Sequence, residues 1–321
     1  YSEAAQNYRR VEQSNDMGRI RSMAQSQLYN LFFKQKQYDS AIVEARHLES
    51  AYPGSDQAPH ALFDVGWAFV LWGKRDSATA AFTDLITRYP KSQFDVRARY
   101  QIGQNYFESG DYQKAIEILA ELVKLYRPEK FDSKAWEKVE LKAVRDKMKF
   151  EAAAGKDEDI SNLELVAKAS IKIADCYAKM NQYDKAFAQY RMVITQYSLM
   201  PTLVEISYVK MADLALAVKG IDEAVYVYQR AIDESFGKKD LQAKLQYKIA
   251  KTYEDQKIFI KAAEEYAFFM RAYPDVQAEI KFSLEQANLN AAIMFYNALN
   301  YRSAIAYADT FQRRFPTSDA A

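Results

Sequence analysis

The side chains that most often perform catalysis or bind metals are scarce in this chain of 321 residues. Its histidines, His47 and His60, belong to no HExxH motif and to no His/Cys cluster with metal-ligand spacing. The single cysteine, Cys176, lies inside an apolar helical pattern, where a buried and unreactive thiol is the usual outcome. The sequence contains no glycine-rich phosphate loop and no GxSxG element. We therefore predict no catalytic residues, no metal site and no cofactor, and we expect a protein that is not an enzyme.

The charge and the turn residues narrow the class of protein further. Lys and Arg total 44 against 43 for Asp and Glu, which gives a net charge of +1 and none of the basic excess typical of nucleic-acid binders. Only 9 Gly and 7 Pro occur, so the turns must be few and short, as in all-α proteins. The longest apolar stretch, Ala61 to Trp72, is too short to span a bilayer as a helix. We predict an all-α protein without a nucleic-acid partner or a membrane span in this chain.

One pattern recurs along the whole chain and predicts helix pairs. An alanine is followed by an apolar or aromatic residue four and seven positions later, and the pattern repeats at intervals of 37, 37, 71, 38, 38 and 42 residues. Intervals of this size are typical of stacked helix pairs, and the 71-residue interval fits one unit plus an insertion. We predict seven pairs, each with its anchoring alanine in the second helix. The anchoring residues are Ala41, Ala78, Ala115, Ala186, Ala224, Ala262 and Ala304.

Prolines and turn residues mark the limits of the predicted helices. A proline twelve residues after the anchoring alanine can end the second helix, and it occurs at Pro53, Pro90, Pro274 and Pro316. Five residues between the two helices of a pair are of types that tolerate a left-handed backbone: Gly73, Gly110, Asn181, Gly220 and Asn300.

The first helix of each pair has its own signature. A small residue lies at Gly66, Gly103, Ala174, Ala212, Ala250 and Ala292, and an aromatic residue at Phe32, Phe69, Tyr106, Tyr177, Tyr253 and Phe295. Tyr29 replaces the small residue of the first pair, and Ala215 replaces the aromatic residue of the fifth. With these residues the chain resembles the tetratricopeptide repeat family over most of its length. The resemblance implies an all-α, right-handed α-solenoid of helix-turn-helix units.

The frame also predicts how the chain is organised. We expect repeat units over residues 1–128 and 163–321, and a charged insertion over residues 129–162 with a helix from about Ser133 to Ala154. The insertion is either a spacer helix docked on the solenoid or a partner-binding or hinge element. Residues 1–11 parallel residues 183–193, and residues 315–319 copy residues 52–56. We therefore expect the chain to begin and end within a repeat array, as a fragment of a longer protein.

The family resemblance also implies a ligand groove along the first helices. The groove positions of the first three pairs fall on Met23, Ser26, Asn30, Phe33, His60, Phe63, Trp67, Val70, Arg97, Tyr100, Gln104 and Phe107. An aromatic lining with a few polar groups suits an extended or helical protein segment. The alternative is that these rings pack against adjacent helices. We expect the mixed charges of the later pairs, such as Lys251 and Glu254, to be solvated. Some family members bind a C-terminal carboxylate, and only Asn30 and Arg97 match the residues that they use for it.

These features predict a non-enzymatic scaffold that binds protein or peptide partners through its groove. The alternative is a structural spacer or self-assembly module, with homo-oligomers formed through exposed repeat ends. The Tyr-Pro-x-Ser segments at residues 52–55 and 89–92 look like those of bacterial cell-envelope repeat proteins of the Tol-Pal accessory and barrel-assembly lipoprotein type. That resemblance implies a periplasmic or outer-membrane-associated protein, and a cytoplasmic location is the alternative.

Overall fold

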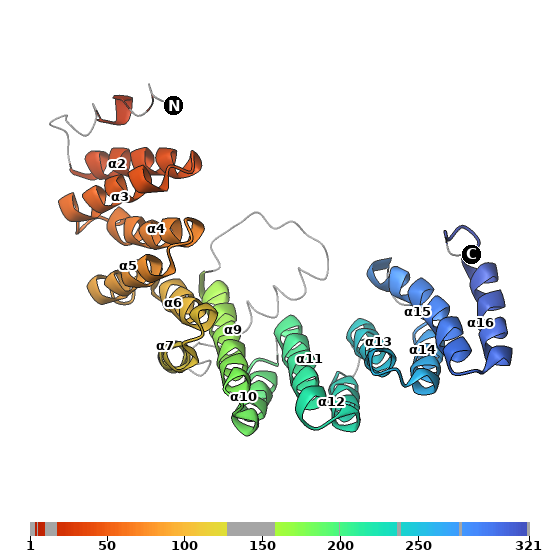
Figure 1. Ribbon diagram of the computed structural model, residues 1–321. Coiled ribbons are helices and arrows are strands. Elements are labelled where there is room, and N and C mark those ends of the chain that lie inside the picture. The colour runs from red at the N-terminus through yellow and green to blue at the C-terminus, as the bar shows by residue number, and fades with distance from the viewer. Residues whose placement is uncertain are drawn as a thin grey trace. The chain divides into compact units, whose positions relative to one another are not determined.

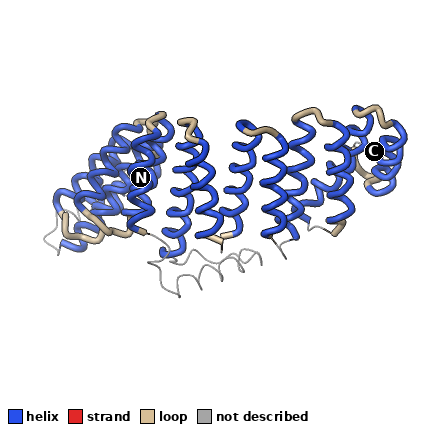
Figure 2. The backbone as a smooth tube through the Cα atoms, turned by 90° about the horizontal axis from the view of Figure 1, so that it is seen from below, coloured by secondary structure: helices blue, strands red, loops and turns tan. Residues whose placement is uncertain are grey.

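All regular secondary structure in the described part of the chain is α-helical, which confirms the predicted fold class (Figure 1). The computed structural model describes Ala4 and residues 6–9, 18–126, 158–198, 200–235, 239–275 and 278–319. These helices form two compact units that divide between Met200 and Pro201. Within each unit, helices that follow each other in the chain pack side by side (Figure 2).

The described helices form seven pairs, as the sequence predicts. Unit 1 contains the pairs α2 (Gly18–Lys34) with α3 (Tyr38–Ala51), α4 (Gln57–Leu71) with α5 (Arg75–Arg88), α6 (Asp95–Ser109) with α7 (Tyr112–Leu125), and α9 (Glu158–Lys179) with α10 (Tyr183–Gln196). Unit 2 contains the pairs α11 (Pro201–Val218) with α12 (Ile221–Glu234), α13 (Lys239–Asp255) with α14 (Phe259–Ala272), and α15 (Ala278–Asn297) with α16 (Tyr301–Arg314).

The anchoring alanines occupy equivalent places in all seven pairs. Each is the fourth residue of a second helix of 14 residues, and each is at most 8% exposed. An aromatic residue follows directly after six of these helices, and four of those are succeeded by the predicted prolines. The periodicity of the sequence therefore fixes the start of every second helix and marks the end of six of them.

A left-handed residue makes the turn inside six of the pairs, five positions before the anchoring alanine. These residues are Lys36, Gly73, Gly110, Asn181, Lys257 and Leu299, with φ between 59° and 84°. In the remaining pair Gly220, at φ 96°, takes this role one position later. Asn300 lies between α15 and α16, as predicted, but it is not left-handed: it has φ −92° and caps α16 by accepting a hydrogen bond from the Ser303 backbone N–H at 3.3 Å. Capping is the favoured use of an Asn at a helix start, so Leu299 has to adopt the left-handed conformation.

The small residues of the first helices are required by close approach of the second helix. A Cβ added at Gly66 would lie 2.4 Å from Cε1 of Phe82, and one added at Gly103 would lie 2.4 Å from Leu119. Tyr29, which departs from this pattern, is fully buried in one core cluster with Ala45, the residue of α3 equivalent to Phe82. The first pair therefore exchanges the large and small partners between its two helices.

Buried carboxylates connect neighbouring helix pairs and the two helices of one pair. Glu49 of α3 is 3% exposed and accepts hydrogen bonds of 2.7 Å from Nη1 of Arg88 and from the Tyr89 hydroxyl, both at the end of α5. Asp95 of α6 is 2% exposed and accepts from Nε of Arg99 at 3.1 Å and from the Tyr126 hydroxyl at 2.7 Å. Full pairing is what makes a buried carboxylate tolerable, so these contacts help to fix the stacking.

The stack of unit 1 continues from α7 to α9. α9 packs on both α6 and α7, as α4 packs on α2 and α3. It begins at Glu158, inside the segment 129–162 that the sequence interpretation treats as an insertion. The predicted helix from Ser133 to Ala154 lies outside the described residues, and the predicted domain limits stay a prediction.

Candidate functional site

The predicted groove residues lie on the first helices of unit 1. We call the nine of them the first-helix face: Asn30, Phe33, His60, Phe63, Trp67, Arg97, Tyr100, Gln104 and Phe107. They come from α2, α4 and α6, and each is partly exposed, neither buried nor fully open to solvent. The neighbouring packing residues Val65 and Gly66 are buried. The same helices therefore direct one set of residues into the core and a second set toward the surface.

His60 and Phe63 of α4 are held against Phe94, which lies directly before α6. The His60 and Phe94 rings stack at 5.2 Å with an interplanar angle of 4°, and the Phe63 and Phe94 rings lie 5.1 Å apart. Nε2 of His60 lies 3.5 Å from a carboxylate oxygen of Asp64. Burial raises the pKa of Asp64, and the nearby His60 and the Tyr29 hydroxyl act in the opposite direction. This end of the face is thus an aromatic surface with a His–carboxylate pair beside it.

Trp67 and Phe63 are also supported from behind by the core. Phe63 packs on the buried ring of Phe82 at 5.5 Å, and Trp67 packs against the same core cluster. Rings fixed in this way lose little conformational entropy when a ligand covers their remaining surface.

The α6 part of the face borders α9. Burial and the nearby Asp175 raise the pKa of Tyr100, so its hydroxyl stays protonated at neutral pH. Nζ of Lys172 lies 4.4 Å from the centre of the Phe107 ring, within the range of a cation–π contact. Nε2 of Gln104 donates to Glu108 at 2.6 Å.

The structure agrees in part with both interpretations of the aromatic residues, as groove lining and as packing between helices. The rings of Phe63, Trp67 and Phe107 contact neighbouring side chains, as the core alternative requires, and they also keep exposed surface, as a groove requires. Their assignment as a ligand groove stays a prediction.

Sequence reasoning missed a hydrogen-bonded network on the first helices of unit 2. Glu254 of α13 accepts from the Tyr266 hydroxyl of α14 and from Nδ2 of Asn290 of α15 at 3.3 Å, and it pairs with Nζ of Lys251 at 2.7 Å. These charges, expected to be solvated, connect three helices. A signal for this network exists in the sequence, because Tyr266 lies four residues after its anchoring alanine. Tyrosines at the same position donate to carboxylates in two other helix pairs, Tyr190 to Asp175 and Tyr228 to Asp213.

The thiol and the possible metal ligands of the described residues were the other candidates for chemistry. Cys176 is fully buried, as predicted, and burial raises the pKa of its thiol to about 12. Within the described ranges, no cluster of His, Cys, Asp and Glu is arranged to hold a metal ion. The same part of the chain has no helix with the length and apolar character needed to cross a bilayer.

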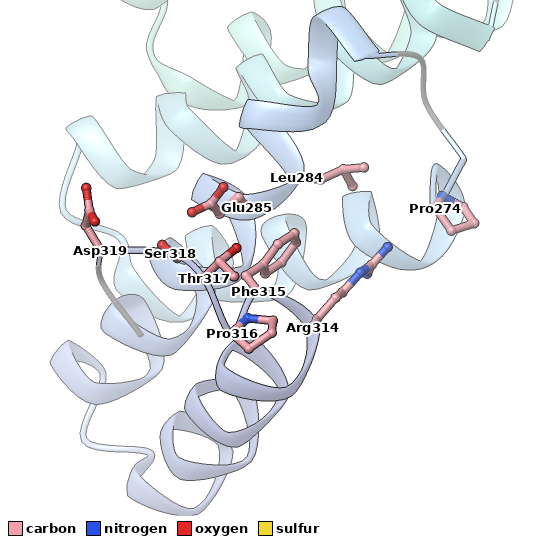
Figure 3. Close-up of a pocket in the computed structure, with 9 residues that line it drawn as sticks. All are labelled: Pro274, Leu284, Glu285, Arg314, Phe315, Pro316, Thr317, Ser318 and Asp319. Atoms are coloured by element: carbon pink, nitrogen blue, oxygen red, sulfur yellow. The ribbon is translucent and has the colours of Figure 1, made fainter.

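An open hollow of about 660 Å³ lies beside the segment after α16. Figure 3 shows Arg314 and Pro274 on one side of it and Glu285 and Asp319 on the other, with the Phe315 ring between them. The backbone N–H of Ser318 donates to the carbonyl of Phe315 at 3.1 Å, as Ser55 does to Tyr52 at 3.0 Å in the loop before α4. The sequence match between these two segments is thus a match of backbone geometry.

Comparison with known families identifies three of the helix pairs. The tetratricopeptide repeat model matches residues 60–92, 97–127 and 168–199, which cover α4–α5, α6–α7 and most of α9–α10. The chain contains tetratricopeptide repeats. Such repeats generally form protein-interaction scaffolds, because stacked units present an extended binding surface.

Solved structures with a similar arrangement are distant. The crystal structure of MamA shares 18% identity, covering 66% of this chain and 96% of that one, with a TM-score of 0.42. The apo form of RapI shares 14% identity, covering 89% and 96%, with a TM-score of 0.45. The pilF protein of Pseudomonas aeruginosa shares 12% identity, covering 83% and 95%, with a TM-score of 0.41. No curated protein sequence matches the chain.

Proposed function

We propose that this chain is a non-enzymatic scaffold that binds an extended segment of a partner protein on the first-helix face of unit 1. One observation carries the proposal: the aromatic residues of this face are held by the core and still partly exposed. A surface of fixed aromatic rings with polar groups at its edge matches the composition of protein interfaces.

Affinity capture with matched variants tests this proposal. The bait is the chain itself, and the comparison is a Trp67→Ala, Tyr100→Ala double variant that keeps the helical circular dichroism of the parent. Tyr226→Ala serves as the control, because Tyr226 is 54% exposed on the second helix α12. We expect the parent and the control to capture a common partner that the double variant loses. Capture of the same partner by all three baits would contradict the proposal.

We propose a cell-envelope location for the protein on the resemblance of its Tyr-Pro-x-Ser segments to those of envelope repeat proteins. The test is fractionation of the source cells followed by immunodetection with an antibody against this chain. Signal in the periplasmic or outer-membrane fraction is the expected result. Signal confined to the cytoplasmic fraction would overturn this part of the proposal.

Self-association through α16 is a second candidate function, and one residue favours it. Ile305 follows its anchoring alanine and is 63% exposed, whereas the equivalent residues Ile42, Ile116 and Val225 are at most 8% exposed. A second copy of this chain that stacks on α16 would cover Ile305. Analytical ultracentrifugation should show a concentration-dependent dimer that Ile305→Lys abolishes and Val43→Lys, on exposed α3 surface, leaves intact. A monomer at all concentrations would refute this candidate.

A further inference from the structure

Exposed apolar side chains are concentrated in the last helix pair of unit 2. Between residues 293 and 305 lie five large apolar residues that are 42% exposed or more: Ile293, Tyr296, Leu299, Tyr301 and Ile305. Elsewhere in the described chain, no segment of this length holds more than two such residues. The nearest acidic residues in sequence are Glu285 and Asp309, and Arg302 carries the one charge between them. This segment is therefore apolar on its exposed side and free of acidic residues.

Leu299 is the most exposed of these residues and the least suited to its backbone conformation. It is 72% exposed in the turn between α15 and α16, with a left-handed φ of 59°. The residues that make the same turn in five other pairs are lysine, glycine or asparagine, which suit an exposed turn. An exposed leucine in this conformation adds nothing to folding, and unfavourable backbone conformations persist most often where they serve a function. A contact with another molecule explains it.

The turn of the preceding helix pair lies next to this one. Lys257 makes the left-handed turn between α13 and α14, five positions before its anchoring alanine, as Leu299 does before Ala304. Turns of three residues join antiparallel helices, and α14 packs on α15, so the two turns lie at one level on one edge of unit 2. We call their exposed residues the turn surface: Lys257, Ile260, Tyr296, Leu299, Tyr301 and Arg302.

The turn surface combines its apolar side chains with two unpaired cations. Lys257 and Arg302 are exposed, and neither forms an ion pair with any residue that the structure describes. Asp255, the exposed acid at the end of α13, is paired with Nζ of Lys251 at 2.9 Å. The same ammonium pairs with Glu254 at 2.7 Å. The acids beside the turn surface are thus held by another lysine, and its own two cations remain available to a ligand.

This composition matches that of protein surfaces that bind membranes. Tyrosine is enriched where membranes meet water, because its ring is apolar and its hydroxyl stays hydrated. The Tyr296 and Tyr301 rings pack edge to face with centres 5.6 Å apart, and both are more than half exposed. Lysine and arginine reach lipid phosphates while their stems stay among apolar groups. Because the two turns lie at one level, a flat bilayer surface can contact them together.

We propose that the turn surface of unit 2 attaches this protein peripherally to an anionic phospholipid bilayer. Leu299 and Ile260 enter the headgroup region. The two tyrosine rings lie at its boundary, and the two cations contact lipid phosphates. Attachment through so few apolar side chains is reversible. The inference goes beyond the proposed function and does not depend on the first-helix face of unit 1.

Vesicle flotation tests the inference. The probes are vesicles of phosphatidylcholine alone and vesicles of phosphatidylcholine mixed with phosphatidylglycerol. We expect the chain to float with the anionic vesicles, to bind the neutral ones more weakly, and to lose anionic binding as salt is raised. Absence of binding to both kinds of vesicle would overturn the inference.

Matched variants locate the contact. Leu299→Gln should weaken binding by about tenfold, as loss of one buried leucine side chain predicts. Phe268→Gln is its control, because Phe268 is 47% exposed in the later half of α14, away from the turn, and it should change nothing. Arg302→Gln should weaken binding to anionic vesicles by about fivefold, whereas Lys244→Gln, on exposed α13 surface, should not. Equal effects of a variant and its control would contradict the proposed contact.

A fluorescent label distinguishes insertion from contact with a protein. Leu299→Cys is labelled with an environment-sensitive nitrobenzoxadiazole dye, and Phe268→Cys is the comparison, since the native Cys176 is fully buried. We expect anionic vesicles to shift the emission to the blue from position 299 and not from position 268. A dimer that depends on Leu299 and forms without vesicle binding would assign the turn surface to a second copy and overturn the membrane proposal. Crosslinking of position 299 to a protein in lysate, again without vesicle binding, would also overturn it.

Discussion

Substitution of Gly66 by alanine tests the close packing that defines the repeat. The added Cβ would lie 2.4, 2.6 and 2.7 Å from three ring atoms of Phe82, whereas ordinary carbon contacts are about 3.5–4.0 Å. The ring would have to retreat by about 1 Å. Phe82 is fully buried and has Phe63 packed on it at 5.5 Å, so a movement of its ring must displace its neighbours.

The expected loss of stability follows from two opposing effects. Overpacking in a core costs about 1–3 kcal/mol, and a retreat of this size by a buried ring belongs in the upper half of that range. Replacing glycine by alanine inside a helix gains about 1 kcal/mol. We therefore expect Gly66→Ala to lower the free energy of unfolding by about 1–2 kcal/mol. Gly103→Ala, against Leu119, should behave in the same way.

Urea denaturation followed by far-UV circular dichroism measures the effect. The matched control is Gly54→Ala, because a Cβ at Gly54 meets nothing within 4 Å, and this variant should stay within about 0.5 kcal/mol of the parent. Adding Phe82→Leu to G66A should recover about 1 kcal/mol relative to the sum of the single changes. If Gly66→Ala is as harmless as Gly54→Ala, the reasoning about close approach is refuted.

Three further predictions follow from single side chains. Leu299→Gly should raise the free energy of unfolding, measured in urea, by about 0.5–1 kcal/mol, because Leu299 is 72% exposed at φ 59°. Leu71→Gly at the end of α4 should lower it, and equal effects of the two substitutions would contradict this. Asn288→Leu should raise the free energy of unfolding by about 1–2 kcal/mol, because the fully buried Asn288 amide has no hydrogen-bond partner among the described residues. Leu62 occupies the equivalent position in α4, and a loss of stability in the variant would contradict this prediction. Cys176 should react with a thiol reagent at pH 8 only after denaturation, because its pKa is raised to about 12; rapid labelling of the folded chain would show that the thiol is accessible.

The periodic part of the fold could be predicted from the sequence. The anchoring alanines locate the second helices, since each is a buried residue at the fourth position of its helix. The small residue of the first helix was also predicted, and the close approach of Phe82 to Gly66 and of Leu119 to Gly103 gives its physical reason.

Features that depend on contacts between helices could not be predicted in this way. Tyr29 fits because Ala45 is small, and this exchange is visible only when the two helices are placed together. Asn300 could serve as a turn residue or as a helix cap, and the local hydrogen bond to Ser303 decided between them. The Glu254 network depends on side chains from three helices, which the charges of α13 alone do not reveal.

The candidate site shows the same division. The repeat frame placed Phe63, Trp67 and Tyr100 on partly exposed helix surface. It did not predict that the Phe94 ring and the Lys172 ammonium border this face. Those neighbours come from the loop before α6 and from α9, beyond the helices that carry the groove positions.

Site-specific photocrosslinking tests the central claim most directly. A benzoylphenylalanine replaces Gln104 on the first-helix face of unit 1, or Arg46 on the exposed side of α3 as the control, and the chain is irradiated in lysate of its source cells. The account predicts a discrete crosslinked partner from position 104 that is lost in the Trp67→Ala, Tyr100→Ala background, and none from position 46. The same partner crosslinked from position 46, or retained in that background, would contradict it.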